Sequence, residues 1–101
     1  MRSAWVMKLK PGQVAMYKQK HDEIWPEMVD LLKQQGIRNY TIYRHGLTLF
    51  AYFERDGAAP ARSGEIDPVV LRWWKWMEPQ METRPDSSPT VEPVEEMFRL
   101  D

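Results

Sequence analysis

Cysteine is absent from the 101-residue sequence, and histidine occurs only twice. The absence of cysteine excludes disulfides, thiolate metal sites and cysteine nucleophiles. With only two imidazoles as possible ligands or bases, we predict no metal site. A chain of this size also leaves no room for a separate cofactor-binding module.

An excess of charge of one sign and long hydrophobic runs are also absent. Fourteen basic and fifteen acidic residues are interspersed and leave a net charge of -1, which predicts neither a nucleic-acid partner nor an anionic membrane partner. No apolar run is long enough to span a bilayer, and Met1 to Trp5 lacks the apolar stretch of a secretory signal. We therefore expect a cytoplasmic protein with a small neutral partner.

Apolar bulk is what the sequence has in surplus. Hydrophobic residues make up 43% of the chain, with five tryptophans and seven methionines. This is more than the thin core of one small domain needs. Because the length fits a single domain over residues 1–101, we expect the surplus to face a ligand or a second subunit.

Hydrophobic periodicity predicts an alternation of strands and helices. In chain order we expect a strand at 3–10, a helix at 13–35, strands at 39–44 and 48–54 joined at Gly46, a loop at 55–66, a helix from Pro68 to Met81, a loop at 84–93 and a strand at 94–100. Pro26 should kink or interrupt the first helix beside Trp25. Asp67 is a good N-cap for the second helix.

This order, β-α-β-β-α-β, predicts an α+β fold of the ferredoxin-like split βαβ type. Such a fold has a four-stranded antiparallel sheet with two helices on one face. The other face would carry part of the surplus apolar residues, and pairing two sheets in a homodimer is the simplest way to cover it. The sequence therefore favours the dimeric α+β barrel arrangement.

His21 is the first candidate for chemistry, because it lies on the apolar stripe of the first predicted helix, one turn from both Tyr17 and Trp25. An isolated histidine on an apolar face is more often a hydrogen-bonded core residue than a functional group. The aromatic neighbours favour a partly buried imidazole suited to general acid–base catalysis. His45 falls in the predicted hairpin turn and is assigned no role.

Aromatic side chains are the second candidate group. Trp73, Trp74 and Trp76 fan around the second predicted helix and cannot all enter one core. One of them at least is explained by packing, but an indole also stacks on the apolar face of a pyranose while its N–H donates to hydroxyls. Tyr40 belongs to the hairpin and shares a face with Ile42, where packing is the more common role.

These residues resemble a known family. The segment from Tyr17 to Tyr43, with its His21 and Ile24-Trp25-Pro26-Glu27 spacing, the Trp73-Trp74 pair and the tail from Pro85 to Phe98 are similar to L-rhamnose mutarotases nearly end to end. The resemblance implies a homodimeric ferredoxin-like fold and exchange of the α and β anomers of L-rhamnose without a cofactor. Residues 56–66, rich in Gly, Ala and Pro, depart from the family pattern at the expected rim of the pocket.

The resemblance also implies roles for individual residues. His21 corresponds to the proton donor of the family, and the sugar contacts fall on Tyr17, Tyr40, Trp73 and Trp74. We expect His21 to protonate the ring oxygen, while Tyr17, Tyr40, a carboxylate or a bound water handles the hydroxyl proton. Two other functions stay open: a small dimeric-barrel monooxygenase, and a non-catalytic carbohydrate-binding or regulatory module.

Overall fold

The computed structural model describes residues 1–57 and 66–101. Its elements follow in the order β1 (Arg2–Lys8), α1 (Val14–Asp22), α2 (Pro26–Gln34), β2 (Ile37–His45), β3 (Thr48–Arg55), α3 (Pro68–Met77), the short 3-10 helix η1 (Glu78–Gln80) and β4 (Glu92–Pro93). Among these described residues, no helix combines the length and the apolar character needed to cross a membrane.

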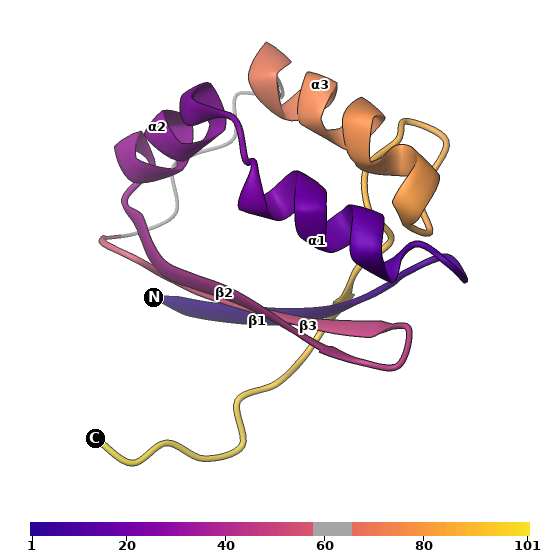
Figure 1. Ribbon diagram of the computed structural model, residues 1–101. Coiled ribbons are helices and arrows are strands. Elements are labelled where there is room, and N and C mark those ends of the chain that lie inside the picture. Colours follow the sequence, from indigo (N-terminus) through magenta and orange to yellow (C-terminus); the bar gives the residue numbers. More distant parts are fainter. Residues whose placement is uncertain (58–65) are drawn as a thin grey trace.

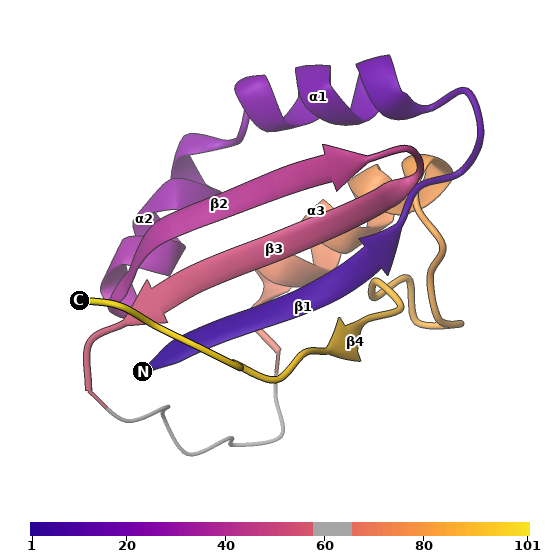
Figure 2. The ribbon, with the colours of Figure 1, turned by 90° about the horizontal axis from the view of Figure 1, so that it is seen from below.

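The sheet has the strand order β2-β3-β1-β4, and each neighbouring pair is antiparallel. The helices lie on one side of it, and the C-terminal tail leaves on the other (Figure 1). The view from below shows the strands with no helix in front of them (Figure 2). This arrangement confirms the predicted α+β fold with a ferredoxin-like split βαβ topology.

The helical layer differs from the prediction, because residues 1–57 and 66–101 form three α-helices and not two. The predicted helix at 13–35 is divided: α1 ends at Asp22, and α2 begins at Pro26. Between them Trp25 is extended, with φ -62° and ψ 135°. Proline disfavours helical geometry in the residue before it and is well tolerated at the first position of a new helix. The expected interruption beside Trp25 is therefore confirmed, and it places His21 in the last turn of α1.

The start of α3 is as predicted, and its end is not. The Asp67 carboxylate accepts a hydrogen bond from the Val69 N–H (2.9 Å), which makes Asp67 the N-cap. The α-helix stops at Met77 and tightens into η1, which contains Pro79, so the predicted continuation to Met81 is wrong. Proline lacks the N–H that would continue the helical ladder. Of the predicted loop at 55–66, residues 58–65 lie outside the described part of the chain.

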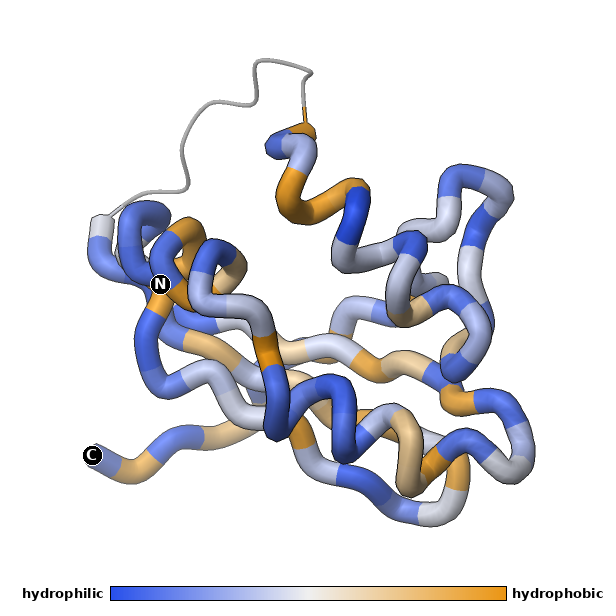
Figure 3. Tube along the Cα trace, turned by 45° about the horizontal axis from the view of Figure 1, so that its top comes forward, coloured by the Kyte–Doolittle hydropathy of each residue, from blue (hydrophilic) through white to orange (hydrophobic). Residues whose placement is uncertain are grey.

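The last strand is the main correction. We predicted it at 94–100, whereas β4 comprises only Glu92–Pro93, which pair with Val6 and Trp5 of β1. The Val94 N–H still donates to the Ala4 carbonyl (3.2 Å), but the chain then leaves the sheet. A proline inside the strand removes a ladder donor, which limits pairing. The tail therefore carries its apolar residues (orange in Figure 3) in the open: Met97, Phe98 and Leu100 are more than 80% exposed.

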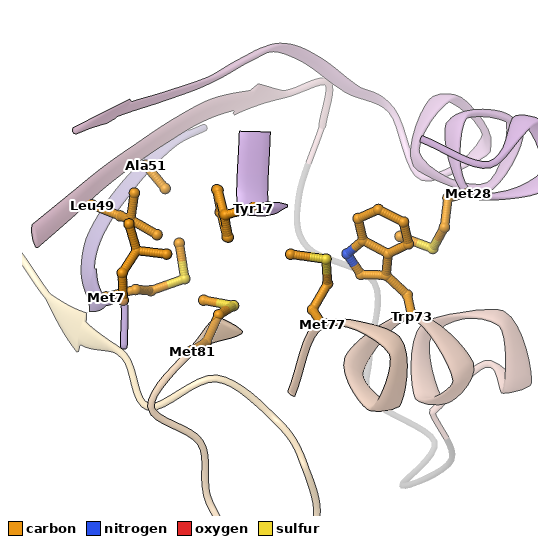
Figure 4. Packing of buried hydrophobic residues seen from close by; sticks show 9 residues of the cluster. Met7, Tyr17, Met28, Leu49, Ala51, Trp73, Met77 and Met81 are labelled. Atoms are coloured by element: carbon orange, nitrogen blue, oxygen red, sulfur yellow. The ribbon is translucent and has the colours of Figure 1, made fainter. Parts of the chain in front are cut away.

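The hydrophobic core lies between the sheet and the helices (Figure 4). It is formed by Met7, Leu9, Tyr17, Met28, Leu49, Ala51, Trp73, Met77 and Met81. Within it the Trp73 indole lies between Met28 of α2 and Met77 of its own helix (Figure 4). Methionine is flexible and fills irregular gaps, so its frequency here fits a core packed around large aromatic rings.

Candidate functional site

A cavity of about 1160 Å³ lies between the helices and the sheet. Its walls are mainly aromatic and aliphatic side chains, with a few polar groups, which is the usual composition of a small-molecule site. The five residues predicted from the sequence all line this cavity: Tyr17, His21, Tyr40, Trp73 and Trp74. They come from α1, β2 and α3, so the fold brings together residues that are more than 50 positions apart in the chain.

The His21 imidazole is held by its own helix and by aromatic rings. Its Nδ1 lies 3.1 Å from the Tyr17 carbonyl oxygen. Because a carbonyl can only accept, Nδ1 carries the proton and Nε2 is left for another partner. The Tyr17 ring stacks on the imidazole at a centroid distance of 4.2 Å, and the Trp73 indole meets it edge-on at 5.3 Å. Trp25 packs against Trp73 (5.1 Å) behind this pair.

Burial shifts the pKa values of three groups that line the cavity, His21, Tyr17 and Tyr40. It lowers the pKa of His21, although the hydrogen bond with the Tyr17 backbone and the charge of Asp22 oppose the shift. Burial also raises the pKa of Tyr17 well above its ordinary value, with a smaller contribution from Tyr40. Although 40% of Tyr40 remains exposed, desolvation of its hydroxyl raises its pKa to about 12. At neutral pH the imidazole is therefore mainly neutral, and both phenols keep their protons.

Tyr40 reaches the cavity through an irregularity in β2. The register with β3 shifts between Arg38 and Thr41, and Asn39 adopts a positive φ of 52°. Two residues of β2 thus oppose one of β3, which is a β-bulge. The Tyr40 ring packs edge-on against Trp5 (5.8 Å) and Phe53 (5.7 Å), and these two rings contact each other at 5.3 Å.

Trp5 and Phe53 line the cavity but were not singled out in the sequence. Each is an aromatic residue in an alternating strand, and such a residue looks the same whether it faces a core or a ligand. The signal that could have found Trp5 is its spacing: it shares a strand face with Met7 and Leu9, the face that the helices cover.

The tryptophans of α3 divide as predicted, because they do not enter one core. Trp73 is buried, Trp74 is partly buried and Trp76 is 50% exposed. Trp73 and Trp74 line the cavity, while Trp76 packs at the outer side of the helices, where its ring lies 6.5 Å from that of Trp25. Helix α3 therefore contributes two indoles to the wall that could contact a sugar ring.

Charged groups are few along the cavity. Lys18 and Asp22 form an ion pair of 2.6 Å at one side. Arg55 stacks over Phe53 at 5.5 Å, and its buried Nε has no hydrogen-bond partner among residues 1–57 and 66–101. Over the same residues, no group of three or more His, Cys, Asp or Glu side chains is placed to hold a metal ion. The groups available for chemistry are therefore the His21 imidazole, the phenols of Tyr17 and Tyr40, and the indoles of the cavity wall.

Comparison with known proteins agrees with this geometry. The family model for L-rhamnose mutarotase matches residues 2–100. The chain is 44% identical to the L-rhamnose mutarotase of Mesorhizobium japonicum, covering 96% of this chain and 94% of that one, and 41% identical to that of Listeria monocytogenes, covering 98% and 97%. A crystal structure of the L-rhamnose mutarotase from Formosa agariphila has a TM-score of 0.91 at 37% identity, over 100% and 99% of the two chains.

The fold, the cavity and these matches define an isomerase that acts on carbohydrates. Within that class, the chain belongs to the L-rhamnose mutarotase family.

Proposed function

We propose that this chain interconverts the α and β anomers of L-rhamnose, or of a closely related pyranose, and so supports rhamnose metabolism. The observation that carries the proposal is the His21 imidazole, held between Tyr17 and Trp73 on the wall of an aromatic cavity. Membership of the mutarotase family supports the same conclusion. The reaction needs no cofactor, because it only moves protons and opens and closes one C–O bond.

His21 acts as the acid. In its protonated form Nδ1–H donates to the Tyr17 carbonyl, and Nε2–H gives its proton to the ring oxygen. At the same time the anomeric hydroxyl loses its proton, and the bond between C1 and the ring oxygen breaks to give the open-chain aldehyde. Rotation about C1–C2 presents the other face of the carbonyl, and closure returns the proton to Nε2. Burial makes the His21 cation a stronger acid than free imidazolium, since it lowers the pKa.

The other cavity residues bind and orient the sugar. Trp73 and Trp74 offer indole faces to the apolar side of the pyranose. Tyr17 and Tyr40 keep their protons at neutral pH, because burial raises both pKa values, and they can donate to sugar hydroxyls. Either phenol can also pass on the hydroxyl proton by accepting one proton as it releases another; a carboxylate or a bound water remains the alternative for this step.

The function is tested by measuring anomer exchange with NMR saturation transfer, for L-rhamnose and a panel of other pyranoses. Positioned acid–base groups contribute on the order of 10² to 10⁴ in rate, so we expect His21→Ala to lose about that factor. His45→Ala, at an exposed hairpin residue, is the matched control and should exchange L-rhamnose as the parent does. Equal rates in the parent and His21→Ala would show that the acid is assigned wrongly.

The same experiment separates the other two functions. A carbohydrate-binding module would bind a sugar of the panel without accelerating its exchange, and His21→Ala would leave its affinity unchanged. A monooxygenase would consume oxygen in the presence of a quinol. Family membership and the acid at the cavity wall both favour the mutarotase.

We further propose that two copies pair through the uncovered face of the sheet. Tyr43 and Phe50 lie on this face and are 65% and 45% exposed, and the tail adds Met97 and Phe98. A second copy offers the same apolar side chains, so pairing would remove those of each copy from water. The expected absence of nucleic-acid and membrane partners stays a prediction from the balanced charge. The cytoplasmic location stays a prediction from the lack of a long apolar run and of a secretory stretch.

A further inference from the structure

Lys20, the residue before His21, reaches from α1 to the far end of α3. Its Nζ donates to the Trp76 backbone carbonyl (2.6 Å) and to Oε1 of Gln80 (2.7 Å). The same ammonium lies 4.1 Å from the centre of the Trp76 ring. One side chain thus makes two hydrogen bonds and a cation–π contact to the segment that ends the third helix.

The connection continues through Gln80 to the start of α1. The Gln80 side chain is buried, at 5% exposure, and its Nε2 donates to Oε1 of Gln13, the residue before α1 (3.2 Å). The Gln80 carbonyl accepts from the Lys10 N–H (2.9 Å). Gln13, Gln80, Lys20 and the Trp76 carbonyl therefore form a polar chain, called here the Lys20 tie, that holds both ends of α1 against η1 and the end of α3.

The Lys20 tie differs physically from the surface ion pairs of the same helices. A cation at a helix C-terminus satisfies a free carbonyl and interacts favourably with the helix dipole. Without Lys20, the buried Gln80 amide oxygen would lose its donor, which is costly for a buried polar group. By contrast, Lys75 pairs with Glu78 at 3.7 Å while its side chain is 76% exposed, and such pairs contribute little.

The tie lies next to the contact that matters for chemistry. Trp73 is one helical turn before Trp76 on α3, and His21 directly follows Lys20 on α1. The Lys20–Trp76 contact and the His21–Trp73 contact therefore both join α1 to α3, and they lie about one helical turn apart on α3. Sliding or rotation of α1 against α3 would change both contacts together.

We propose that Lys20 is a positioning residue, which fixes α1 against α3 and thereby holds the His21 imidazole between Tyr17 and Trp73 in the orientation that proton transfer requires. This inference rests on the proposed function of His21 as the acid. Small misplacements of a catalytic group have large kinetic effects, since about 1 Å can cost a factor on the order of 10².

Three variants test the role of Lys20. Lys20→Met keeps a long side chain but removes the charge and the donors, and Lys20→Arg keeps both and can still stack on an indole. Lys75→Met, in the last turn of α3, is the matched control. For L-rhamnose exchange we expect Lys20→Met to lower kcat by about ten- to a hundredfold with a smaller change in KM. Lys20→Arg should recover most of the loss, and Lys75→Met should match the parent.

A second readout does not depend on turnover. The chain has two histidines, so NMR can follow the titration of each imidazole, with His45 as the internal reference. Lys20→Met is expected to change the chemical shifts and the titration midpoint of His21 and to leave the chemical shifts of His45 in place. This readout decides the positioning role even if the parent shows no exchange, in which case the proposed function alone fails.

The inference is overturned if Lys20→Met retains the parent kcat and the parent His21 signals. It is also overturned if Lys20→Arg fails to recover the parent kcat and the parent His21 signals. The position of α1 would then not depend on the contacts that a cation makes at this place. Circular dichroism checks that each variant is folded. Should Lys20→Met not fold, Lys20→Gln, which keeps a donor for the Trp76 carbonyl, replaces it in the same two measurements, with the same outcomes deciding.

Discussion

The two faces of the sheet differ both in what covers them and in how apolar they are. On β3, Leu49 and Ala51 are 1% and 2% exposed, while Phe50 between them is 45% exposed. Side chains alternate along a strand, so the two buried residues point toward the helices and Phe50 points to the opposite face. The uncovered face is mixed in sequence, because Arg2, Lys8 and Glu54 share it with Phe50. An apolar residue in a strand therefore does not by itself tell a core from a surface that awaits a partner.

The two faces should differ most in how much stability is lost when one methionine is truncated on each of them. Met77 of α3 is 2% exposed in the core, and Met97 of the tail is 83% exposed. We expect Met77→Ala to lower the free energy of unfolding by about 2–5 kcal/mol, because it leaves a cavity. Met97→Ala should change it by less than about 0.5 kcal/mol, measured by urea unfolding at a concentration where the chain is monomeric. Similar losses in both variants would mean that the tail is packed in solution.

A charge placed on the uncovered face tests whether a second copy covers it. Phe50→Glu would put an unpaired carboxylate in the interface, which costs about 3 kcal/mol and weakens the dimer by more than a hundredfold. Sedimentation velocity measures the change in mass. Lys33→Glu, near the end of α2, makes a charge change on the helical side and should leave the dimer intact. A parent protein that is monomeric at high concentration would refute the proposed pairing.

The pH dependence of stability tests whether His21 is buried on the covered face, because burial lowers the pKa of this imidazole. The folded protein then binds a proton less readily than the unfolded chain, whose imidazole has a pKa of about 6.5. The contribution of His21 to stability is therefore constant above that pH and is lost as the pH falls from 6.5 through the folded pKa. We expect the parent to lose more stability than His21→Gln over this interval in urea unfolding. Parallel curves would contradict a buried imidazole.

The smallest effect on stability is expected at Asp67, the N-cap of α3. Removing the Asp67 carboxylate leaves the Val69 N–H without its partner. Asp67→Ala should cost about 1 kcal/mol of stability, and Asp67→Asn, which keeps an accepting oxygen, should cost less. Thermal unfolding of the two variants side by side gives the difference. A loss of the same size in both would assign the effect to the charge and not to the hydrogen bond.

Local signals predicted most of the fold. Pro26 and Asp67 each act on their immediate neighbours, so the break between α1 and α2 and the start of α3 could be derived from the sequence. The final strand could not, because the apolar residues after Pro93 match a strand pattern whether or not a partner strand is present. In the structure the ladder between β1 and the C-terminal segment comprises Glu92 and Pro93.

The sequence predicted five residues of the candidate site but missed others that line the cavity or hold its helices in place. His21 stood out because a titratable group replaced an aliphatic one on a helical stripe, and the resemblance to a family supplied Tyr17, Tyr40, Trp73 and Trp74; all five line one cavity. The contribution of Trp5 and Phe53 depends on which strands are neighbours, and the Lys20 tie depends on where α3 ends. Such contacts over long sequence distances are set by packing, which no local pattern contains.

The bulge in β2 has a consequence for how this family of sequences can vary in length. Side chains alternate along a strand, so Ile37 and Tyr40, three positions apart, could not face the same side of a regular strand. The extra residue at Asn39 allows both to do so. A relative that lost one residue here would turn either the buried isoleucine or the cavity tyrosine outward. Insertions and deletions at this point should therefore occur in pairs or not at all, whereas single substitutions of Asn39 by glycine, which adopts a positive φ freely, should be accepted.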